Sequence, residues 1–241
     1  MFLKSKYSYW LVCFLFLTSL CQSCDVKNNL DRNDSDKISV VILGSSNAYG
    51  YGASSLKSSW AELLRKDITG LMYNLSYPGY TTYHFLPYDA PNYRNVTPDK
   101  ERNIEAAIKL SPKIIIFSIT TNDIAFGYSI DEYLNNMKVM TDLCVANKIE
   151  YLITGTLPRN PFSLVARKAL YDLNRELEKK YLERYVEIFN PVADLETYKW
   201  QENLCYEDFI HPNDAGHMII YKEVLKAYNK YKLRIQTSKF D

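Results

Sequence analysis

Short hydrophobic runs alternate along the chain with longer segments in which hydrophobic residues recur every three or four positions. The runs end at glycine, proline or polar residues, and they lie at 38–43, 72–75, 114–118, 151–154 and 186–189. A continuous hydrophobic run of this length is typical of a parallel strand that is buried on both faces. The pattern therefore predicts about five strands.

The segments between these runs have the periodicity of helices. We predict helices at 58–68, 101–110, 130–147, 162–184 and 215–230. In the first of them, Trp60 and Leu64 fall on one face, and Ser59 is in place to cap the start. Strands that alternate with helices form a parallel sheet covered on both faces, so the sequence predicts a three-layer α/β/α sandwich.

The N-terminal segment has a different pattern. Lys4 and Lys6 precede residues 9–20, which are almost wholly apolar, and polar residues follow. This stretch is shorter than the roughly 20 residues that a membrane-spanning helix needs. A basic start followed by a short apolar run is instead typical of a secretory signal peptide.

Cys24 follows a small residue, Ser23, just after the apolar run. This resembles the lipobox of bacterial lipoproteins, so we expect residues 1–24 to be a lipoprotein signal peptide and Cys24 to carry the lipid. An uncleaved anchor, or cleavage with release, is the alternative. Residues 25–37 are polar and rich in Asn and Asp, which predicts a flexible tether before a folded domain at 38–241.

The amino-acid composition limits the number of domains and the kinds of partner that we expect. The chain has 241 residues, of which 47% are hydrophobic and 24% charged, enough for one α/β domain and its N-terminal segment. The formal net charge is +1, and no run rich in Lys or Arg occurs. We therefore expect no nucleic acid partner.

Polar residues directly after the strands are the candidates for chemistry, because ligands of such sheets bind beyond the carboxyl ends of the strands. The first strand is followed by a loop with three glycines, Gly44, Gly50 and Gly52, and with Ser46 near the strand exit. A serine at this point can face solvent as a nucleophile. Taken alone, such a loop more often forms a plain turn or holds a phosphate on its N–H groups, although this one lacks the lysine and the spacing of a P-loop.

Two further strand exits carry groups that can donate hydrogen bonds to a developing negative charge. Gly79 can bring a bare backbone N–H against a substrate, although Pro-Gly more often marks an ordinary turn. Asn122 follows the third strand, where its side chain can donate to an oxyanion or cap a helix.

The chain has only three histidines, and His211 has Asp208 three residues before it. That carboxylate can reach the imidazole when the loop curls, fixing its tautomer and stabilising the imidazolium. A metal site built from Asp208, His211, Asp214 and His217 is the weaker alternative, because the spacing matches no standard zinc motif. We expect no metal and no cofactor, and we expect His217 to pack or cap in the last helix.

Taken together and in this order, the four loops resemble those of the SGNH hydrolases, also called GDSL esterases and lipases. The resemblance implies a flavodoxin-like SGNH fold and a serine ester hydrolase. It implies that Ser46 is the nucleophile, His211 the base and Asp208 the acid of a catalytic triad. It further implies an oxyanion hole formed by the backbone N–H groups of Ser46 and Gly79 and the side chain of Asn122.

Two positions depart from the family pattern. Ser45 replaces the aspartate of Gly-Asp-Ser, and Thr120 replaces the glycine of Gly-x-Asn-Asp. These changes leave open an SGNH-like domain that binds an acylated or carbohydrate ligand without turnover. A phosphate-binding α/β domain is a further alternative, but it leaves the Asp208/His211 pair unexplained.

The substrate class is predicted less sharply than the reaction. The resemblance implies an esterase, and the substrate is expected to be a small-molecule ester or, if the aromatic residues described next stack on a sugar, an acetylated glycan that the enzyme deacetylates. Six aromatic residues at 77–93, next to Gly79, can stack on a sugar ring, or they can simply pack. With the lipid on Cys24, we expect a membrane-anchored protein of the cell envelope, periplasmic or at the cell surface.

Overall fold

The computed structural model describes residues 37–237 of the chain, with side chains up to residue 234. The signal peptide, Cys24 and all but the end of the tether at 25–37 lie outside the described residues and stay predictions. Between residues 37 and 237, no helix is both long and apolar enough to cross a membrane.

The centre of the fold is a sheet of five parallel strands in the order β2-β1-β3-β4-β5. The strands are β1 (Val40–Gly44), β2 (Met72–Asn74), β3 (Ile114–Ser118), β4 (Glu150–Thr154) and β5 (Tyr185–Val186). The chain runs from β1 outward to β2, and then returns to the other side of β1 for β3. Such a reversal between β1 and β3 opens a crevice at their carboxyl ends, where ligands of open α/β sheets bind.

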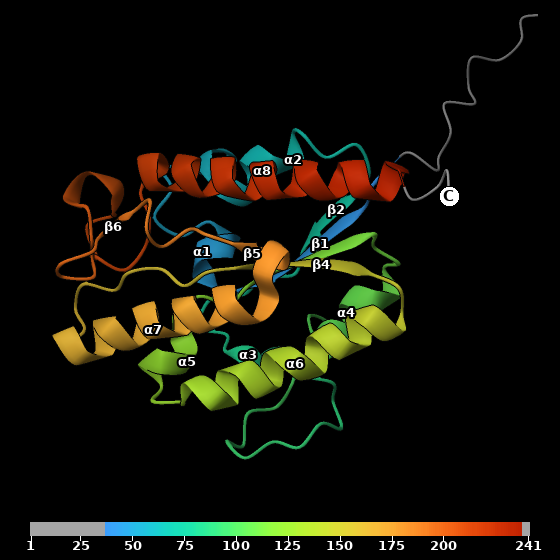
Figure 1. Ribbon diagram of the computed structural model, residues 1–241, viewed down its shortest axis with the longest axis horizontal. Coiled ribbons are helices and arrows are strands. Elements are labelled where there is room, and N and C mark those ends of the chain that lie inside the picture. The colour runs from blue at the N-terminus through green and yellow to red at the C-terminus, as the bar shows by residue number, and fades with distance from the viewer. Residues whose placement is uncertain (1–36, 238–241) are drawn as a thin grey trace, which may run out of the picture. The chain divides into compact units, whose positions relative to one another are not determined.

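Helices cover both faces of this sheet, as the sequence predicted. They are α1 (Ser46–Tyr49), α2 (Trp60–Arg65), α3 (Thr82–Phe85), α4 (Ile104–Lys109), α5 (Asn122–Ala125), α6 (Ile130–Ala146), α7 (Leu164–Tyr181) and α8 (Asp214–Thr237). In Figure 1, α2 and α8 lie above the sheet, and α3 to α7 lie below it. The three-layer α/β/α prediction is confirmed.

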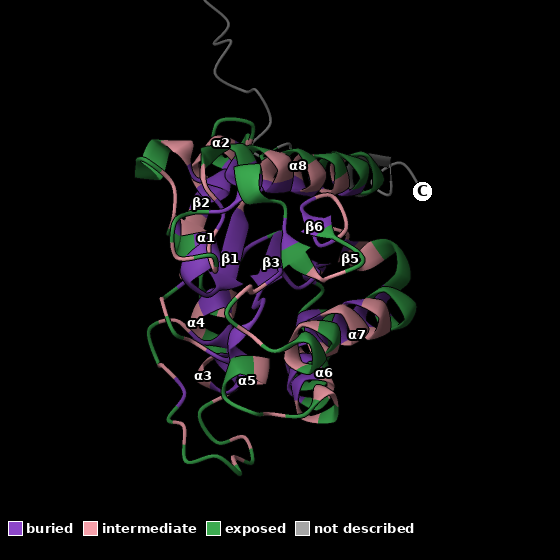
Figure 2. Cartoon of the chain, turned by 90° about the vertical axis from the view of Figure 1, so that its left-hand side faces the viewer, coloured by how far each residue is buried: buried purple, intermediate pink, exposed green. Residues whose placement is uncertain are grey.

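Two hydrophobic cores lie on opposite faces of the sheet because side chains alternate along each strand. Val40 and Ile42 of β1 join the core under α2 and α8, where Trp60 is fully buried. Val41 and Leu43 join the core that α4, α6 and α7 cover. The strands are therefore buried on both faces between the two helical layers (Figure 2).

Some elements differ from their predicted bounds. The last predicted strand, 186–189, is only Tyr185–Val186, because the Glu187 carboxylate accepts the backbone N–H groups of Phe189 and Asn190 and turns the chain. The predicted helix at 162–184 ends at Tyr181, before Leu182, whose φ is +49°.

Other elements were not predicted at all. A small antiparallel hairpin of β6 (Ala193–Asp194) and β7 (Lys199–Trp200) was missed, as were the single-turn helices α1, α3 and α5. Each of these is too short for a hydrophobic period to register.

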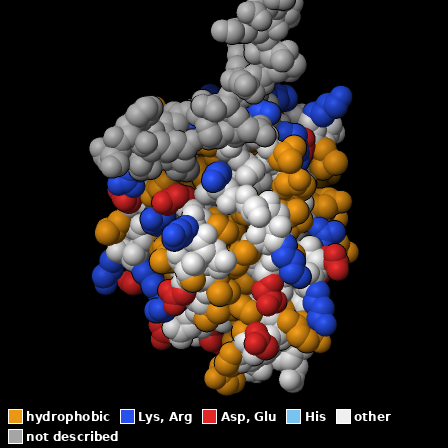
Figure 3. Space-filling model, turned by 90° about the vertical axis from the view of Figure 1, so that its right-hand side faces the viewer, with side chains coloured by type: hydrophobic (Ala, Val, Ile, Leu, Met, Phe, Trp, Pro, Cys, Tyr) orange, Lys and Arg blue, Asp and Glu red, His pale blue; other side chains and the backbone are white. Residues whose placement is uncertain are grey.

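Acidic and basic side chains are interspersed over the described part of the face in Figure 3, with hydrophobic side chains between them. Several ion pairs join neighbours on the same helix, such as Lys168 with Asp172 and Lys138 with Asp142. Exposed pairs of this kind contribute well under 1 kcal/mol each. This face therefore gives no sign of a single-sign electrostatic surface.

Candidate active site

The site begins where β1 ends. Gly44 closes the strand in a place that admits no side chain, since a Cβ there would lie 2.6 Å from Ala48 Cβ and 2.9 Å from the Ser118 carbonyl oxygen. Ser46 then starts α1 at the carboxyl edge of the sheet, with 9% of its surface exposed. Its hydroxyl therefore lies at the crevice between β1 and β3.

A loop from the C-terminal part of the chain brings an imidazole to this hydroxyl. The His211 Nε2 lies 2.8 Å from the Ser46 Oγ, although the two residues are 165 positions apart. Gly52 makes the approach possible: its φ is +84°, and a Cβ there would lie 2.2 Å from the Pro212 carbonyl oxygen. Only glycine tolerates both conditions.

The other ring nitrogen of His211 faces a carboxylate. Asp208 Oδ2 lies 2.5 Å from His211 Nδ1, and Asp208 Oδ1 accepts the backbone N–H groups of Ile210 and His211. Burial alone would raise the pKa of Asp208, but the hydrogen bonds from the His211 ring and from these two N–H groups outweigh it and lower that pKa. An ionised carboxylate only accepts, so Nδ1 donates to Asp208, and Nε2 is left to accept from the Ser46 hydroxyl.

Further hydrogen-bond donors follow the neighbouring strands at the same edge of the sheet. The backbone N–H groups of Ser46 and Gly79 donate to no acceptor in the described part of the chain. Gly79 has a φ of +81°, with open space where a side chain would stand. Asn122 starts α5 and gives one amide hydrogen to the Tyr80 carbonyl oxygen at 2.9 Å, which leaves the second free. All five predicted site residues therefore meet at the carboxyl edge of the sheet.

This arrangement is suited to acyl transfer. A hydroxyl, an imidazole and a carboxylate form one chain of hydrogen bonds, and unpaired N–H donors lie at the same edge of the sheet. A family model described as GDSL-like lipase/acylhydrolase matches residues 42–219. The chain belongs to this family. It is accordingly an ester hydrolase.

Solved structures with the GDSL-like fold resemble the chain over most of its length. A GDSL-like lipase from Bacteroides thetaiotaomicron is 22% identical, with a TM-score of 0.63 over 82% of this chain and 90% of that one. The psychrotrophic esterase EstA from Pseudoalteromonas sp. is 16% identical, with a TM-score of 0.59 over 80% and 98%. These likenesses concern the fold. Among curated proteins, none matches this chain.

The two departures from the GDSL-like pattern lie beside the site without blocking it. Thr120 is buried, and its hydroxyl accepts a hydrogen bond from the Asn47 side chain at 2.9 Å. Ser45 is fully buried, and its hydroxyl has no partner. Thr120 thus joins the segment after β3 to α1, and the side chain of Ser45 takes no part in the hydrogen-bond chain.

The residues of the alternative metal site are used for other contacts. Asp214 accepts the backbone N–H and the hydroxyl of Ser54. His217 is buried in α8, where Nδ1 accepts the Trp60 N–H and Nε2 donates to the Tyr51 carbonyl oxygen. Within residues 37–237, no cluster of three His, Cys, Asp or Glu residues is arranged to hold a metal ion.

The aromatic segment at 77–93 is divided between packing and surface. Tyr83 and Phe85 are buried, and Tyr80 stacks on His84 with ring centroids 4.2 Å apart. Three tyrosines remain exposed by 45% to 84% of their surface: Tyr77, Tyr88 and Tyr93. Three of the six aromatic side chains are therefore used in packing, and only the other three are exposed enough to contact a ligand.

A cavity of about 650 Å³ lies beside the His211 loop, at the β6–β7 hairpin. Its lining includes Asn160, Trp200 and Phe209, and it does not include Ser46 or His211. The cavity is thus next to the candidate site and separate from it.

Sequence reasoning missed two residues at this edge of the hydrolase. Asp123 is completely buried behind Asn122, and Arg159 follows β4 and reaches towards Thr121. The rule that polar residues after strands are candidates applied to β4 as well, and it would have found Arg159. Asp123 gave no separate signal, because its partner Thr82 lies 41 positions away.

Proposed function

We propose that this protein is a serine ester hydrolase in which Ser46, His211 and Asp208 form the catalytic triad. The Ser46 hydroxyl attacks the ester carbonyl carbon while His211 Nε2 takes its proton. Asp208 holds the imidazole in the productive tautomer and stabilises the imidazolium. The alcohol leaves with a proton from His211, and water then repeats the attack on the acyl-enzyme.

The tetrahedral intermediates carry a negative charge on the former carbonyl oxygen. In this proposal, the backbone N–H groups of Ser46 and Gly79 and the free amide hydrogen of Asn122 donate to that oxygen. Such donors are already oriented before the reaction, so they stabilise the transition state more than the ground state.

One observation supports the proposal most directly: the unbroken chain of hydrogen bonds from the Ser46 hydroxyl through His211 to Asp208, with distances of 2.8 and 2.5 Å. Nothing in the packing of the buried core requires a serine hydroxyl to contact an imidazole here. The pair therefore favours turnover over passive binding of an acylated ligand.

The test combines hydrolysis of p-nitrophenyl acetate with covalent labelling by a fluorophosphonate. We expect Ser46→Ala to lose both turnover and labelling, because within residues 37–237 no other hydroxyl is hydrogen-bonded to His211. His211→Ala should lose turnover by up to roughly 10⁶-fold. Asn122→Ala should keep a trace of activity, since removal of one oxyanion donor costs about 10²–10³ in rate.

Ser45→Ala is the matched control. It removes the neighbouring serine hydroxyl, which is buried and unpartnered, so both turnover and labelling should persist. Undiminished turnover in Ser46→Ala, or a label on a residue other than Ser46, would refute the triad.

A further inference from the structure

Arg159 lies where the two halves of the candidate site meet. It is in the loop between β4 and α7, and its Nη1 lies 3.5 Å from the hydroxyl of Thr121, the residue before Asn122. The next residue, Asn160, donates its backbone N–H to the carbonyl oxygen of Phe209, in the loop that carries Asp208 and His211. Arg159 is thus beside both the oxyanion donors and the base.

The guanidinium of Arg159 has unusually few partners for its position. The long contact with Thr121 is its only hydrogen bond to the described residues, and the guanidinium also lies over the face of Phe162, 5.0 Å from the ring centroid. Burial lowers the pKa of Arg159, and the charge of Asp208 opposes this only in part, without forming an ion pair. A planar group with five N–H donors is therefore half-buried with most of them unused.

The other arginines of residues 37–237 are paired. Six of them contact a carboxylate: Arg65, Arg94, Arg102, Arg175, Arg184 and Arg234. Arg167 donates to two backbone carbonyl oxygens. Leaving a partly buried cation without strong acceptors is costly, and Arg159 is the one arginine of residues 37–237 that pairs with neither a carboxylate nor a carbonyl oxygen.

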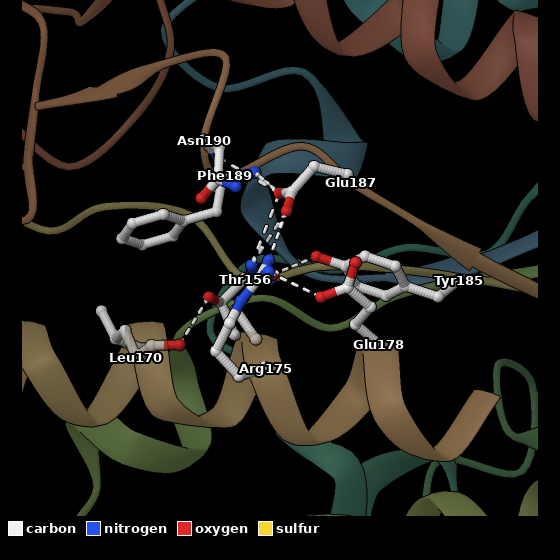
Figure 4. Close-up of polar contacts among 9 residues, drawn as sticks. Thr156, Leu170, Arg175, Glu178, Tyr185, Glu187, Phe189 and Asn190 are labelled. Atoms are coloured by element: carbon white, nitrogen blue, oxygen red, sulfur yellow. Dashed lines mark hydrogen bonds and ion pairs between the residues drawn. The ribbon is translucent and has the colours of Figure 1, made fainter. Parts of the chain in front are cut away.

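Hydrogen bonds to α7 fix the start of the loop that carries Arg159. Thr156 donates its hydroxyl to the Leu170 carbonyl oxygen at 2.8 Å, and its backbone N–H goes to the Asn174 side chain. Figure 4 shows Thr156 and Leu170 next to the Arg175–Glu187 ion pair, between α7 and the start of the loop. These bonds fix the backbone at the start of the loop from which Arg159 extends, which lowers the entropy lost when a ligand binds there.

We infer that Arg159 binds a carboxylate on the ester substrate, so that this hydrolase favours esters with an anionic group near the scissile bond. The inference rests on the proposed function. A guanidinium fork matches a carboxylate with two parallel hydrogen bonds. The charge of Asp208 nearby favours a singly charged group over a doubly charged phosphate.

The test compares three esters: p-nitrophenyl acetate, p-nitrophenyl hydrogen succinate, and 3-carboxy-4-nitrophenyl acetate. The second has its carboxylate on the acyl side, and the third has it on the leaving group. We expect Arg159→Met to lower kcat/KM for one of the carboxylate esters by about 10- to 100-fold, mainly through KM, because hydrogen bonds to a charged group are lost. Turnover of p-nitrophenyl acetate should stay within about twofold.

Two further variants separate recognition from general effects. Arg159→Lys keeps the charge but cannot form two parallel hydrogen bonds, so its decrease in kcat/KM for the carboxylate ester should be intermediate. This variant replaces Arg159→Met in the test if Arg159→Met folds poorly. Lys168→Met removes an exposed cation of α7 and should leave all three esters unchanged.

Equal losses on neutral and anionic esters would overturn the inference, since Arg159 would then act on the reaction itself. No loss on either carboxylate ester would also overturn it. Both results leave the proposed function standing as long as wild-type protein hydrolyses p-nitrophenyl acetate and is labelled at Ser46. A wild type that does neither refutes the proposed function, and this inference with it.

Discussion

Asp123 is a carboxylic acid in the interior of the protein, with 1% of its surface exposed. Its oxygens accept the backbone N–H and the hydroxyl of Thr82, and Asn136 donates to that same hydroxyl at 2.8 Å. The contact ties the start of α5, which carries Asn122, to the start of α3. Burial raises the pKa of Asp123 to about 7, although the hydrogen bonds from Thr82 oppose the shift.

This raised pKa makes stability depend on pH. In the unfolded chain the carboxyl titrates near pH 4, so between about pH 4 and 7 the folded state binds more protons, and stability falls as pH rises. We expect wild type to lose about 1 kcal/mol per pH unit between pH 5 and 7 relative to Asp123→Asn, and nothing more above pH 8. Urea unfolding of both proteins across this range measures the difference.

Asp131→Asn serves as a control for the loss of a carboxylate, since Asp131 is exposed on α6. Parallel stability curves for wild type and Asp123→Asn would show that Asp123 has no raised pKa.

At the residue scale, the sequence located groups that follow strands in recognisable order. Ser46, Gly79, Asn122 and the Asp208/His211 pair all lie together at the predicted edge. Contacts such as the one between Asp123 and Thr82 could not be predicted, because they depend on which two helix starts meet.

At the scale of elements, β3 and α6 were predicted almost to the residue, since both have long, unbroken hydrophobic patterns. The loop after β4 shows what such patterns miss. A Cβ on Gly155 would lie 2.1 Å from the Asn174 Oδ1 of α7 and 2.9 Å from the Tyr185 hydroxyl. In the sequence Gly155 is simply the residue after the predicted strand at 151–154, whereas the structure needs a glycine there for the close approach of α7.

Gly155→Ala should therefore destabilise the protein by about 2–4 kcal/mol, because the methyl group displaces Asn174 and breaks its bonds to Thr156 and Tyr185. Gly127→Ala is the control: Gly127 has a φ of +74° but open space around it, so only about 1 kcal/mol is lost. Thermal and urea unfolding compare the two. If Gly155→Ala loses no more unfolding free energy than Gly127→Ala, the loop after β4 must move to make room for the methyl group.

At the scale of the whole molecule, the last helix, α8, packs against residues 51–60 near the start of the described chain. Asp214 binds Ser54, and His217 bridges the Trp60 N–H and the Tyr51 carbonyl oxygen. The overall fold was predictable because alternating strands and helices allow few topologies. The contacts of Asp214 and His217, 157 to 166 positions apart in sequence, were not predictable.

Burial lowers the pKa of His217 to about 4, so the ring is neutral in the folded protein. The unfolded state then binds more protons between pH 6.5 and 4, and stability falls as pH drops through this window. We expect wild type to lose about 2–3 kcal/mol from pH 6.5 to 4 relative to His217→Gln. Asp123 changes stability in the opposite direction over much of this range, so only the comparison with the variant reveals the effect.

Chemical denaturation at pH 4, 5, 6 and 7 measures the unfolding free energy of wild type and of His217→Gln. If His217→Gln follows the wild-type curve below pH 6, the imidazole is not held neutral by its surroundings.

The hydrogen bond between Ser46 and His211 joins residues 165 positions apart. A nascent chain on the ribosome therefore exposes the hydroxyl long before the imidazole has been synthesised. Under the proposed mechanism, no ester is cleaved during translation, and catalytic competence begins only when the last segment has docked. Onset of hydrolysis in a refolding experiment would then report the final step of assembly.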